Sequence, residues 1–295
     1  MALLPSDHGA RGAPTMMDIL AHEPAIRLGV FLGVLLVVAT CEARAPRRER
    51  TVSRRARWPH NLGIAALNTL IVRGALPLTA VGLAALAEER GWGLFSGHGS
   101  LPGWLVVLLS VAVLDLAIYL QHVLFHAVPV LWRLHRMHHA DLDFDVTTGV
   151  RFHPLEILLS MLFKLALIVA LGSPAIAVMI FEALLNAGSL FNHANLRLPA
   201  PVDRVLRRLV VTPDMHRVHH SAIPVETNSN FGFTFPWWDW LGGTYRAQPA
   251  AGHAAMTIGL EAFRDPRYLR LDQLLIQPLL GPAGPHVITG RRMGP

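Results

Sequence analysis

Hydrophobic residues along this chain collect into four long apolar runs separated by polar segments. The first run covers residues 25–41, the second residues 62–87 and the third residues 102–128. As a helix, the third run would extend about 40 Å, which exceeds the hydrocarbon thickness of about 30 Å in a bilayer. Each of these runs is long enough to predict a membrane-spanning helix, and the third is expected to tilt or to protrude.

The fourth apolar run, residues 155–192, is interrupted by Gly172-Ser173-Pro174. Glycine and proline side by side favour a turn, so this run predicts a hairpin of two short membrane helices, each near the lower length limit for a span. The expected fold is therefore an all-α integral membrane protein. It would have about four to five transmembrane helices, including this helical hairpin in the C-terminal half.

The composition agrees with a membrane protein. Hydrophobic residues make up 52% of the chain, charged residues make up 16%, and the mean hydropathy is +0.40, which excludes an ordinary soluble protein. A single cysteine, Cys41, excludes an intrachain disulfide and any cysteine-ligated zinc or iron–sulfur site. A metal in this protein would have to be bound by nitrogen and oxygen atoms.

Arginine carries nearly all of the positive charge, because Lys164 is the single lysine. Seven arginines lie within residues 44–57, and positive loops favour the cytoplasmic side of a membrane. Residues 88–101 would then lie outside and residues 129–154 inside, and the hairpin would return the chain to the inside. No aromatic-interleaved basic stripe accompanies the cluster, so it predicts a solvated, lipid-facing loop and no nucleic-acid partner.

A signal peptide is the competing interpretation of residues 1–41, because Val38-Ala39-Thr40-Cys41 faintly resembles a lipoprotein cleavage site. Signal peptides carry positive charge before their apolar core, whereas here the charge follows it. We expect one integral unit without linkers. Its parts would be N-terminal membrane helices with a basic loop (residues 1–101), a metal-binding part (residues 102–246) and a cytoplasmic tail (residues 247–295).

Two copies of the pattern His-Arg-x-His-His, at residues 135–139 and 216–220, are the least expected feature of the sequence. With 16 histidines in 295 residues, one such histidine triple would arise by chance about 0.05 times per chain. Neutral imidazole is the commonest metal ligand among ionisable side chains. Clusters this far apart indicate a metal site that is assembled by folding, and the topology above predicts a histidine-rich helical cap on the cytoplasmic face.

The third apolar run carries candidate residues on one helical face. At 3.6 residues per turn, Asp115, Tyr119, His122 and His126 fall within an arc of about 60°. The two histidines are four residues apart, so both rings can reach one ion. Asp115 would lie about 10 Å deeper in the bilayer than His122, at a depth where an unpaired carboxylate is energetically costly. We expect this aspartate to orient a metal ligand.

Within each cluster, the first and fourth histidines would share one helical face, and the fifth would be turned by about 100°. A helical cluster can therefore serve two neighbouring ions. With His193 the candidate ligands outnumber the six that one iron accepts, which favours two metals. The alternatives are a partly protonated basic patch, an adventitious or zinc-binding cluster, and a membrane cytochrome with histidine-ligated haem.

These residues resemble the fatty acid hydroxylase/sterol desaturase superfamily of membrane di-iron oxygenases, whose histidine boxes read HxxxH, HxxHH and a later HxxHH. The resemblance covers residues 105–246 and includes Asp115 and Tyr119 before the first box and Trp238-Asp239 with Gly243-Thr244-Tyr245 after the last. Asp143 and Asp145 with Thr147-Thr148 and Arg151, together with Asn192-His193 and Thr212-Pro213, are most similar to the alkylglycerol monooxygenase branch.

The resemblance implies an O2-dependent enzyme that hydroxylates a C–H bond of a membrane lipid such as a fatty acyl, alkyl ether or sterol-like substrate, with desaturation as the alternative. Two iron ions would be bound by nine histidines: His122, His126, His135, His138, His139, His193, His216, His219 and His220. The sequence has no GxGxxG fingerprint or cysteine cluster, so a separate electron donor is expected, either reduced pterin or a ferredoxin or cytochrome.

Some positions depart from the superfamily pattern. Val123 stands where arginine is frequent, and the intermediate box offers His193 alone, with Asn195 or water as substitutes. His153 precedes a proline, which favours a supporting role over direct metal binding. Asp143, Asp145 and Arg151 are candidates for hydrogen bonds to ligand rings or for contact with a lipid head group, and a solvated loop is the alternative.

Overall fold

The computed structural model describes residues 20, 22–96 and 101–288, and within these residues the chain is helical, with two isolated β-bridges in place of any sheet. The all-α prediction is confirmed. Five helical segments are long and apolar enough to cross a membrane, namely Glu23–Arg44, Arg54–Arg90, Gly103–Ala127, Pro154–Leu171 and Ala175–Asn192. The protein is a multi-pass membrane protein, as the apolar runs predict.

The second apolar run differs from its prediction because it is not one helix. Helix α3 spans Arg54–Ala75 and helix α4 spans Ala80–Arg90. The break contains Pro77, which has no amide hydrogen to donate, and Thr79 caps α4 by accepting a 3.0 Å hydrogen bond from the Gly82 amide. Helix α3 also begins eight residues before the apolar run, inside the arginine cluster.

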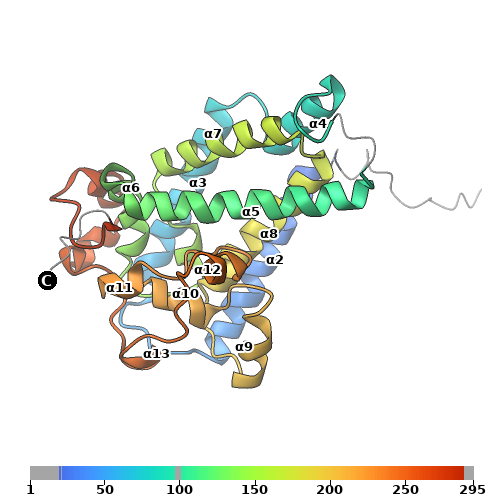
Figure 1. Cartoon of the computed structure of the whole chain (residues 1–295). Helices are drawn as coiled ribbons and strands as arrows, with labels where there is room; N and C mark the ends of the chain where they lie inside the picture. Colours follow the sequence, from blue (N-terminus) through green and yellow to red (C-terminus); the bar gives the residue numbers. More distant parts are fainter. Residues whose placement is uncertain (1–19, 21, 97–100, 289–295) are drawn as a thin grey trace, which may run out of the picture.

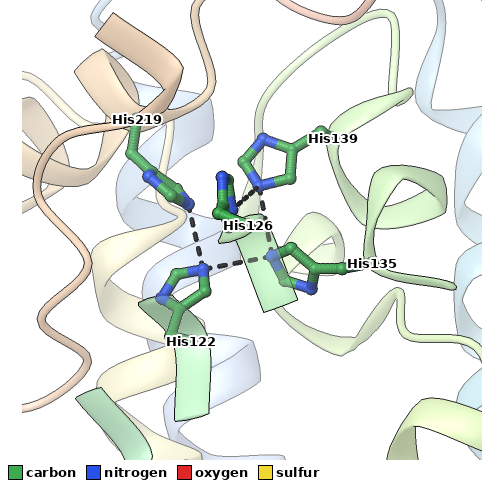
Figure 2. Close-up of side chains that lie close together, drawn as sticks. All are labelled: His122, His126, His135, His139 and His219. Carbon is green, nitrogen blue, oxygen red and sulfur yellow. Dashed lines mark hydrogen bonds between the residues drawn. The ribbon is translucent and has the colours of Figure 1, made fainter. Parts of the chain in front are cut away.

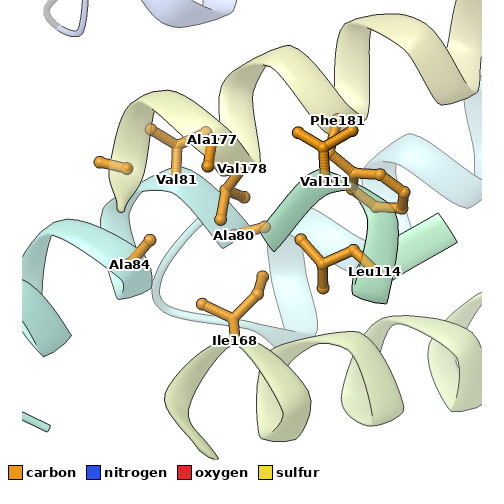
Figure 3. Packing of buried hydrophobic residues seen from close by; sticks show 10 residues of the cluster. Ala80, Val81, Ala84, Val111, Leu114, Ile168, Ala177, Val178 and Phe181 are labelled. Atoms are coloured by element: carbon orange, nitrogen blue, oxygen red, sulfur yellow. The ribbon is translucent and has the colours of Figure 1, made fainter. Parts of the chain in front are cut away.

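Helix α5 (Gly103–Ala127) runs through the middle of the bundle, and α8 (Ala175–Asn192) packs against both α5 and α2 (Glu23–Arg44). Figure 3 shows where α4, α5, α8 and α7 (Pro154–Leu171) meet. Small side chains from α4 and α8 allow close contact there, as is usual between membrane helices. The buried residues of this cluster are Ala80, Val81, Ala84, Val111, Leu114, Ile168, Ala175, Ala177, Val178 and Phe181.

The predicted hairpin is confirmed, and its turn lies at the predicted residues. Gly172 ends α7 with a φ of 64°, a left-handed conformation that favours glycine. The Gly172 and Ser173 amides both donate to the Ile168 carbonyl, at 2.9 and 3.2 Å. Pro174 follows immediately, so α7 stops and α8 starts within three residues.

Four charged side chains of α2, α7 and α8 are paired within the spans. Glu182 on α8 accepts from Lys164 on α7, and its other oxygen lies 2.6 Å from the Arg27 guanidinium of α2. Arg27 also contacts Glu23, at 2.7 Å. These contacts join three helices and avoid the cost of an isolated charge in the membrane.

Short helices gather at the end of the bundle where α5 and α8 finish (Figure 1). They are α6 (Pro129–His139), η1 (Val146–Val150), α9 (Ala200–Leu206), α10 (Pro213–His219), α11 (Pro224–Thr227), α12 (Trp237–Leu241), α13 (Gly252–Ala255), η2 (Glu261–Phe263), η3 (Pro266–Leu269), α14 (Leu271–Ile276) and η4 (Gln277–Leu279). The C-terminal residues pack on α6, where Arg136 donates to the Gln277, Leu280 and Pro282 carbonyls. Residues 277–282 therefore cover part of the first HxxHH helix.

Candidate metal centre

The nine predicted ligand histidines meet at this end of the bundle. They come from α5, α6, the end of α8 and α10, and none is more than 6% exposed. Their nitrogens form two groups, and within each group one nitrogen of every ring lies within 4.8 Å of the others. The group of five is His122, His126, His135, His139 and His219, and the group of four is His138, His193, His216 and His220.

The two HxxHH boxes contribute to the groups in opposite ways. His135 and His139, the first and fifth positions of the earlier box, join the group of five, while His138 joins the group of four. In the later box, the first and fifth positions join the group of four, and His219 joins the group of five. The expected pairing of first with fourth is therefore wrong. On a helix, positions four apart differ by about 40° and positions three apart by about 60°, so the i, i+4 rings converge more closely.

Figure 2 shows the rings of the group of five with their Nε2 atoms turned toward one another. The Nε2 of His122 lies 3.1 Å from that of His135 and 3.0 Å from that of His219. The Nε2 of His139 lies 3.1 Å from that of His126 and 3.2 Å from that of His135. Five ring nitrogens thus converge on one small volume.

The group of four repeats this arrangement. The Nε2 of His193 lies 3.1 Å from that of His138 and 3.1 Å from that of His216. Neither ring nitrogen of His220, the fourth member, has a hydrogen-bond partner among the described residues. A buried imidazole without partners is costly, so this ring points to a ligand that protein atoms do not supply.

The Nδ1 atoms of six of these histidines face hydrogen-bond acceptors. The Nδ1–H group of each ring donates one hydrogen bond. The acceptors are the Phe231 carbonyl for His122 (2.8 Å), Asn228 Oδ1 for His126 (3.0 Å), Glu156 Oε1 for His135 (2.6 Å), the Arg151 carbonyl for His138 (3.2 Å), the Ser189 carbonyl for His193 (2.8 Å) and the Ser229 carbonyl for His219 (2.8 Å). A neutral imidazole has one N–H group. With that proton on Nδ1, the inward Nε2 atoms carry lone pairs.

Converging lone pairs repel each other unless a cation lies between them. Imidazole binds a metal at about 2.0–2.1 Å, so neighbouring ligands at about 90° would lie roughly 3.0 Å apart. The measured Nε2 separations of 3.0–3.2 Å match this value. A set of neutral imidazoles suits iron, zinc or copper, and the two groups therefore fit metal ions.

Five of these rings resist protonation. Burial, reinforced by repulsion from neighbouring rings, lowers the pKa values of His138, His139, His216 and His220 well below the usual value of 6.5. Burial also lowers the pKa of His193, to about 3. The alternative of a partly protonated surface patch is wrong for these clusters, because the rings are buried and resist protonation.

Aromatic side chains surround the two groups. Phe231 contacts rings of the group of five edge-on, at 5.0 Å from His126 and 5.4 Å from His219. Phe152 stacks on His138, with ring centroids 4.4 Å apart. Phe144 lies 5.1 Å from His220. These side chains separate the polar ring nitrogens from water.

Two further side chains, those of Glu156 and Asn228, form hydrogen bonds with ligand rings. Glu156 lies three residues after His153, in the first turn of α7, and its carboxylate faces α6. Asn228 also donates from its amide to the His286 carbonyl at 2.8 Å, which fixes its oxygen toward His126. Both lie close in sequence to motif residues, but sequence spacing alone does not show which of the nearby polar side chains reaches a ring.

Asp143, Asp145 and Arg151 are buried, so the solvated-loop alternative is wrong. No hydrogen bond joins either aspartate to a histidine ring within the described residues. Asp143 Oδ2 accepts from the Thr51 and Val52 amides at 2.8 and 3.2 Å. The guanidinium of Arg151 donates to the Met137 carbonyl at 3.0 Å, and the backbone carbonyl of Arg151 accepts a hydrogen bond from His138 Nδ1.

Arg57 connects the arginine cluster to this region. It is fully buried and contacts Asp141 and Asp145, each at 2.7 Å. Burial alone would raise the pKa of Asp141, but the Arg57 and Arg151 guanidiniums outweigh it and hold that pKa well below its usual range. The cluster is therefore only partly a solvated loop, because Arg57 holds the segment that follows the first HxxHH box.

Asp115 and Tyr119 hold the segment after the third box instead of orienting a ligand ring. Asp115 Oδ2 accepts from Trp238 Nε1 at 2.8 Å, and the Tyr119 hydroxyl lies 3.1 Å from Thr244 Oγ1. A side chain at Gly242 would overlap the Tyr119 hydroxyl. The expectation that Asp115 orients a metal ligand is therefore wrong within the described residues.

His153 and Asn195 have structural partners. His153 caps α7, with Nδ1 accepting from the Leu155 amide at 3.2 Å and Nε2 donating to the Leu275 carbonyl at 3.1 Å. The Asn195 side chain forms two hydrogen bonds with the backbone of Arg48: its Oδ1 accepts from the Arg48 amide at 3.1 Å, and its Nδ2 donates to the Arg48 carbonyl at 2.9 Å. Neither residue is in the two histidine groups.

A family model described as fatty acid hydroxylase matches residues 107–244. These residues contain the three histidine boxes and the contacts of Asp115 with Trp238 and of Tyr119 with Thr244. Over these residues the chain is similar to the fatty acid hydroxylase family. The predicted resemblance to this superfamily is confirmed.

Curated relatives agree. The chain is 28% identical to ornithine lipid hydroxylase OlsE of Rhizobium tropici over 237 residues, which cover 75% of this chain and 67% of the relative. It is 29% identical to alkylglycerol monooxygenase of Xenopus tropicalis over 142 residues, and 28% identical to the human enzyme over 145 residues. These last matches cover 48% and 49% of this chain but 30% and 31% of the relatives. No solved structure matches the chain.

Proposed function

We propose that this protein is an O2-dependent hydroxylase of membrane lipids with two iron ions bound by the nine histidines. The observation that carries this proposal is the convergence of neutral ring nitrogens in one group of five and one group of four. Similarity to the family and the printed activities of the relatives, a lipid hydroxylase and alkylglycerol monooxygenases, support the choice of iron and of a lipid.

Hydroxylation inserts one oxygen atom of O2 into a C–H bond and reduces the other to water, which consumes two electrons and two protons. When bound, the irons would supply the reduction of O2 to an oxidant able to attack an unactivated C–H bond. An external donor, such as a reduced pterin, a ferredoxin or a cytochrome, would supply the electrons.

The residues of this chain hold the site ready for that chemistry. The Nδ1 hydrogen bonds of His122, His135 and His219 fix the orientation of each ring, so Nε2 remains available as a ligand. Phe231 and Phe152 keep water away from the rings. A dry site with fixed ligands confines the oxidant to the substrate.

We also propose that the histidine groups face the cytoplasm, because the arginines within residues 44–57 lie at the same end of the bundle. An isolated β-bridge between Pro46 and Leu196 joins the arginine cluster to the segment just after His193. Positive segments of this kind favour the cytoplasmic side. In this proposal residues 102–246 are the di-iron part, residues 247–295 are a cytoplasmic tail, and the described residues 277–282 of that tail cover α6.

The test combines metal analysis with lipid analysis. Purified protein is expected to contain about two irons per chain and to show no haem absorption, and membranes supplied with labelled dioxygen are expected to yield one labelled oxygen in a lipid. His138→Ala and His219→Ala should lose metal, whereas His60→Ala, on α3 outside both groups, should retain it.

Three results would overturn the proposal. They are one metal or fewer that the histidine variants leave unchanged, zinc in place of iron, or label that enters no lipid. A product with a new double bond and no label would show a desaturase, which begins with the same hydrogen removal.

A further inference from the structure

An apolar groove of about 310 Å³ lies beside the histidine groups. Val34 and Val38 of α2 form one wall, and Leu184 and Gly188 of α8 form another. The segments on either side of the third histidine box complete it, with Val211 before the box and Phe233 after it. Almost all of its lining is hydrocarbon.

Phe233 connects the groove to both histidine groups. It lines the groove, and its ring centroid lies 6.4 Å from that of His122 and 6.4 Å from that of His216. His122 belongs to the group of five and His216 to the group of four. One half-buried phenyl ring thus separates the groove from both candidate metal positions.

We propose that this groove binds the hydrocarbon chain of the substrate lipid, and that Phe233 determines which carbon of the chain reaches the two metal positions. The proposal rests on the hydroxylase function proposed above. It names the path of the chain and a specificity-determining residue.

The location of the groove favours a lipid chain as its occupant. Its walls belong to two membrane-spanning helices, so the surrounding solvent at this depth is lipid. Along α8, the lining from Leu184 to Phe191 extends about 10 Å. Helix α8 ends at Asn192, directly before His193, so the groove runs toward the metal positions from within the bilayer.

Gly188 gives the groove its width, because it contributes no side chain to the wall. A Cβ at this position would lie 3.7 Å from the Phe233 carbonyl and 3.8 Å from Thr234 Oγ1, which is ordinary contact. The Cβ of a leucine at this position would therefore fit without a clash, and the rest of its side chain would extend into the groove. Gly33 on α2 offers a matched control, because a Cβ there meets nothing within 4 Å.

The binding test uses a long-chain fatty acid with a photoreactive diazirine near its terminal methyl group, added to metal-free protein in vesicles. We expect crosslinks at residues 184–191 and 231–235 that exceed those on Leu120, a lipid-exposed residue of α5. Gly188→Leu should reduce the groove crosslinks at least several-fold, and Gly33→Leu should not.

The specificity test compares products of iron-loaded protein. Phe233→Ala should let the chain advance and should move the hydroxyl along it by at least one carbon, while Phe233→Trp should stop the chain earlier and lower turnover. Iron content should stay at the wild-type value in both variants and in Gly188→Leu, because none of these changes removes a ring nitrogen.

The two arms separate the groove from the chemistry. Crosslinks spread evenly over exposed apolar positions, or unaffected by Gly188→Leu, would overturn the groove as a chain site whatever the activity. Groove crosslinks together with a protein that forms no hydroxylated lipid would support chain binding and reject the hydroxylase. An unchanged product position in both Phe233 variants would reject the role of Phe233.

Discussion

The carboxylate of Glu156 accepts a 2.6 Å hydrogen bond from Nδ1 of His135, across the gap between α7 and α6. The two residues are 21 positions apart, and both are buried. This contact places the His135 proton on Nδ1 and leaves Nε2 for a metal. It also ties the orientation of one ligand ring to the first turn of a membrane helix.

Removing this carboxylate should weaken metal binding. Partners of metal-bound histidines typically change affinity or activity by about 10- to 100-fold, so Glu156→Ala should lower iron retention within that range. Glu156→Gln keeps an acceptor oxygen but no charge, and its loss should be smaller. Iron retained during dialysis against a chelator measures the effect, with exposed Glu261→Ala as the control. Equal retention in all three variants would contradict the assigned role.

Because each HxxHH box contributes histidines to both groups, double substitutions within one box should differ in how much iron they remove. His135 and His139 contribute to the same group, so the double variant His135→Ala/His139→Ala should lose no more iron than the more affected single variant, about one per chain. His138 contributes to the other group, so His135→Ala/His138→Ala should lose both irons. Metal analysis of the four variants decides this. The same iron content in the two double variants would refute the assignment.

Arg57 is expected to be essential for stability. Arg57→Ala leaves Asp141 and Asp145 buried without their partner, which typically costs about 3–5 kcal/mol. Arg57→Lys should recover little, because one ammonium group cannot reproduce the contacts of a guanidinium with both carboxylates. Thermal unfolding in detergent measures the change, and Arg55→Ala, at an exposed position nearby, should leave it within about 0.5 kcal/mol. A similar small change for Arg57→Ala would show that the network does not stabilise the fold.

Iron-free protein should become less stable in acid. The unfolded chain takes up protons on its histidines near pH 6.5, whereas burial keeps the folded rings neutral and lowers the pKa of His193 to about 3. For His193 this contribution to the free energy of unfolding is fully present above pH 6.5 and is lost as the pH falls toward about 3, by up to about 1.4 kcal/mol per pH unit. Unfolding of the iron-free protein across this range tests the prediction, and a midpoint that stays constant down to pH 4 would disprove it.

Much of the fold follows from sequence pattern alone. Hydropathy located the spans and the hairpin turn at Gly172, because a membrane helix must be long, apolar and internally hydrogen-bonded. It did not find the break between α3 and α4, because Pro77 lies within a run whose hydropathy stays high. It also did not separate Arg57 from its neighbours, since burial of one arginine among seven depends on distant aspartates.

The sequence by itself identified the nine candidate ligand histidines, because eight of them recur at the i, i+3 or i+4 spacings that bring imidazole rings together on a helix. Tertiary structure decided how those ligands divide into two groups, which acceptors hold their Nδ1 atoms, and that Phe233 lies between an apolar groove and both groups. Local helix geometry limits which rings of one box can converge. The partners of each ring come from helices and loops up to about a hundred residues away, and their approach is set by packing, which a one-dimensional pattern does not contain.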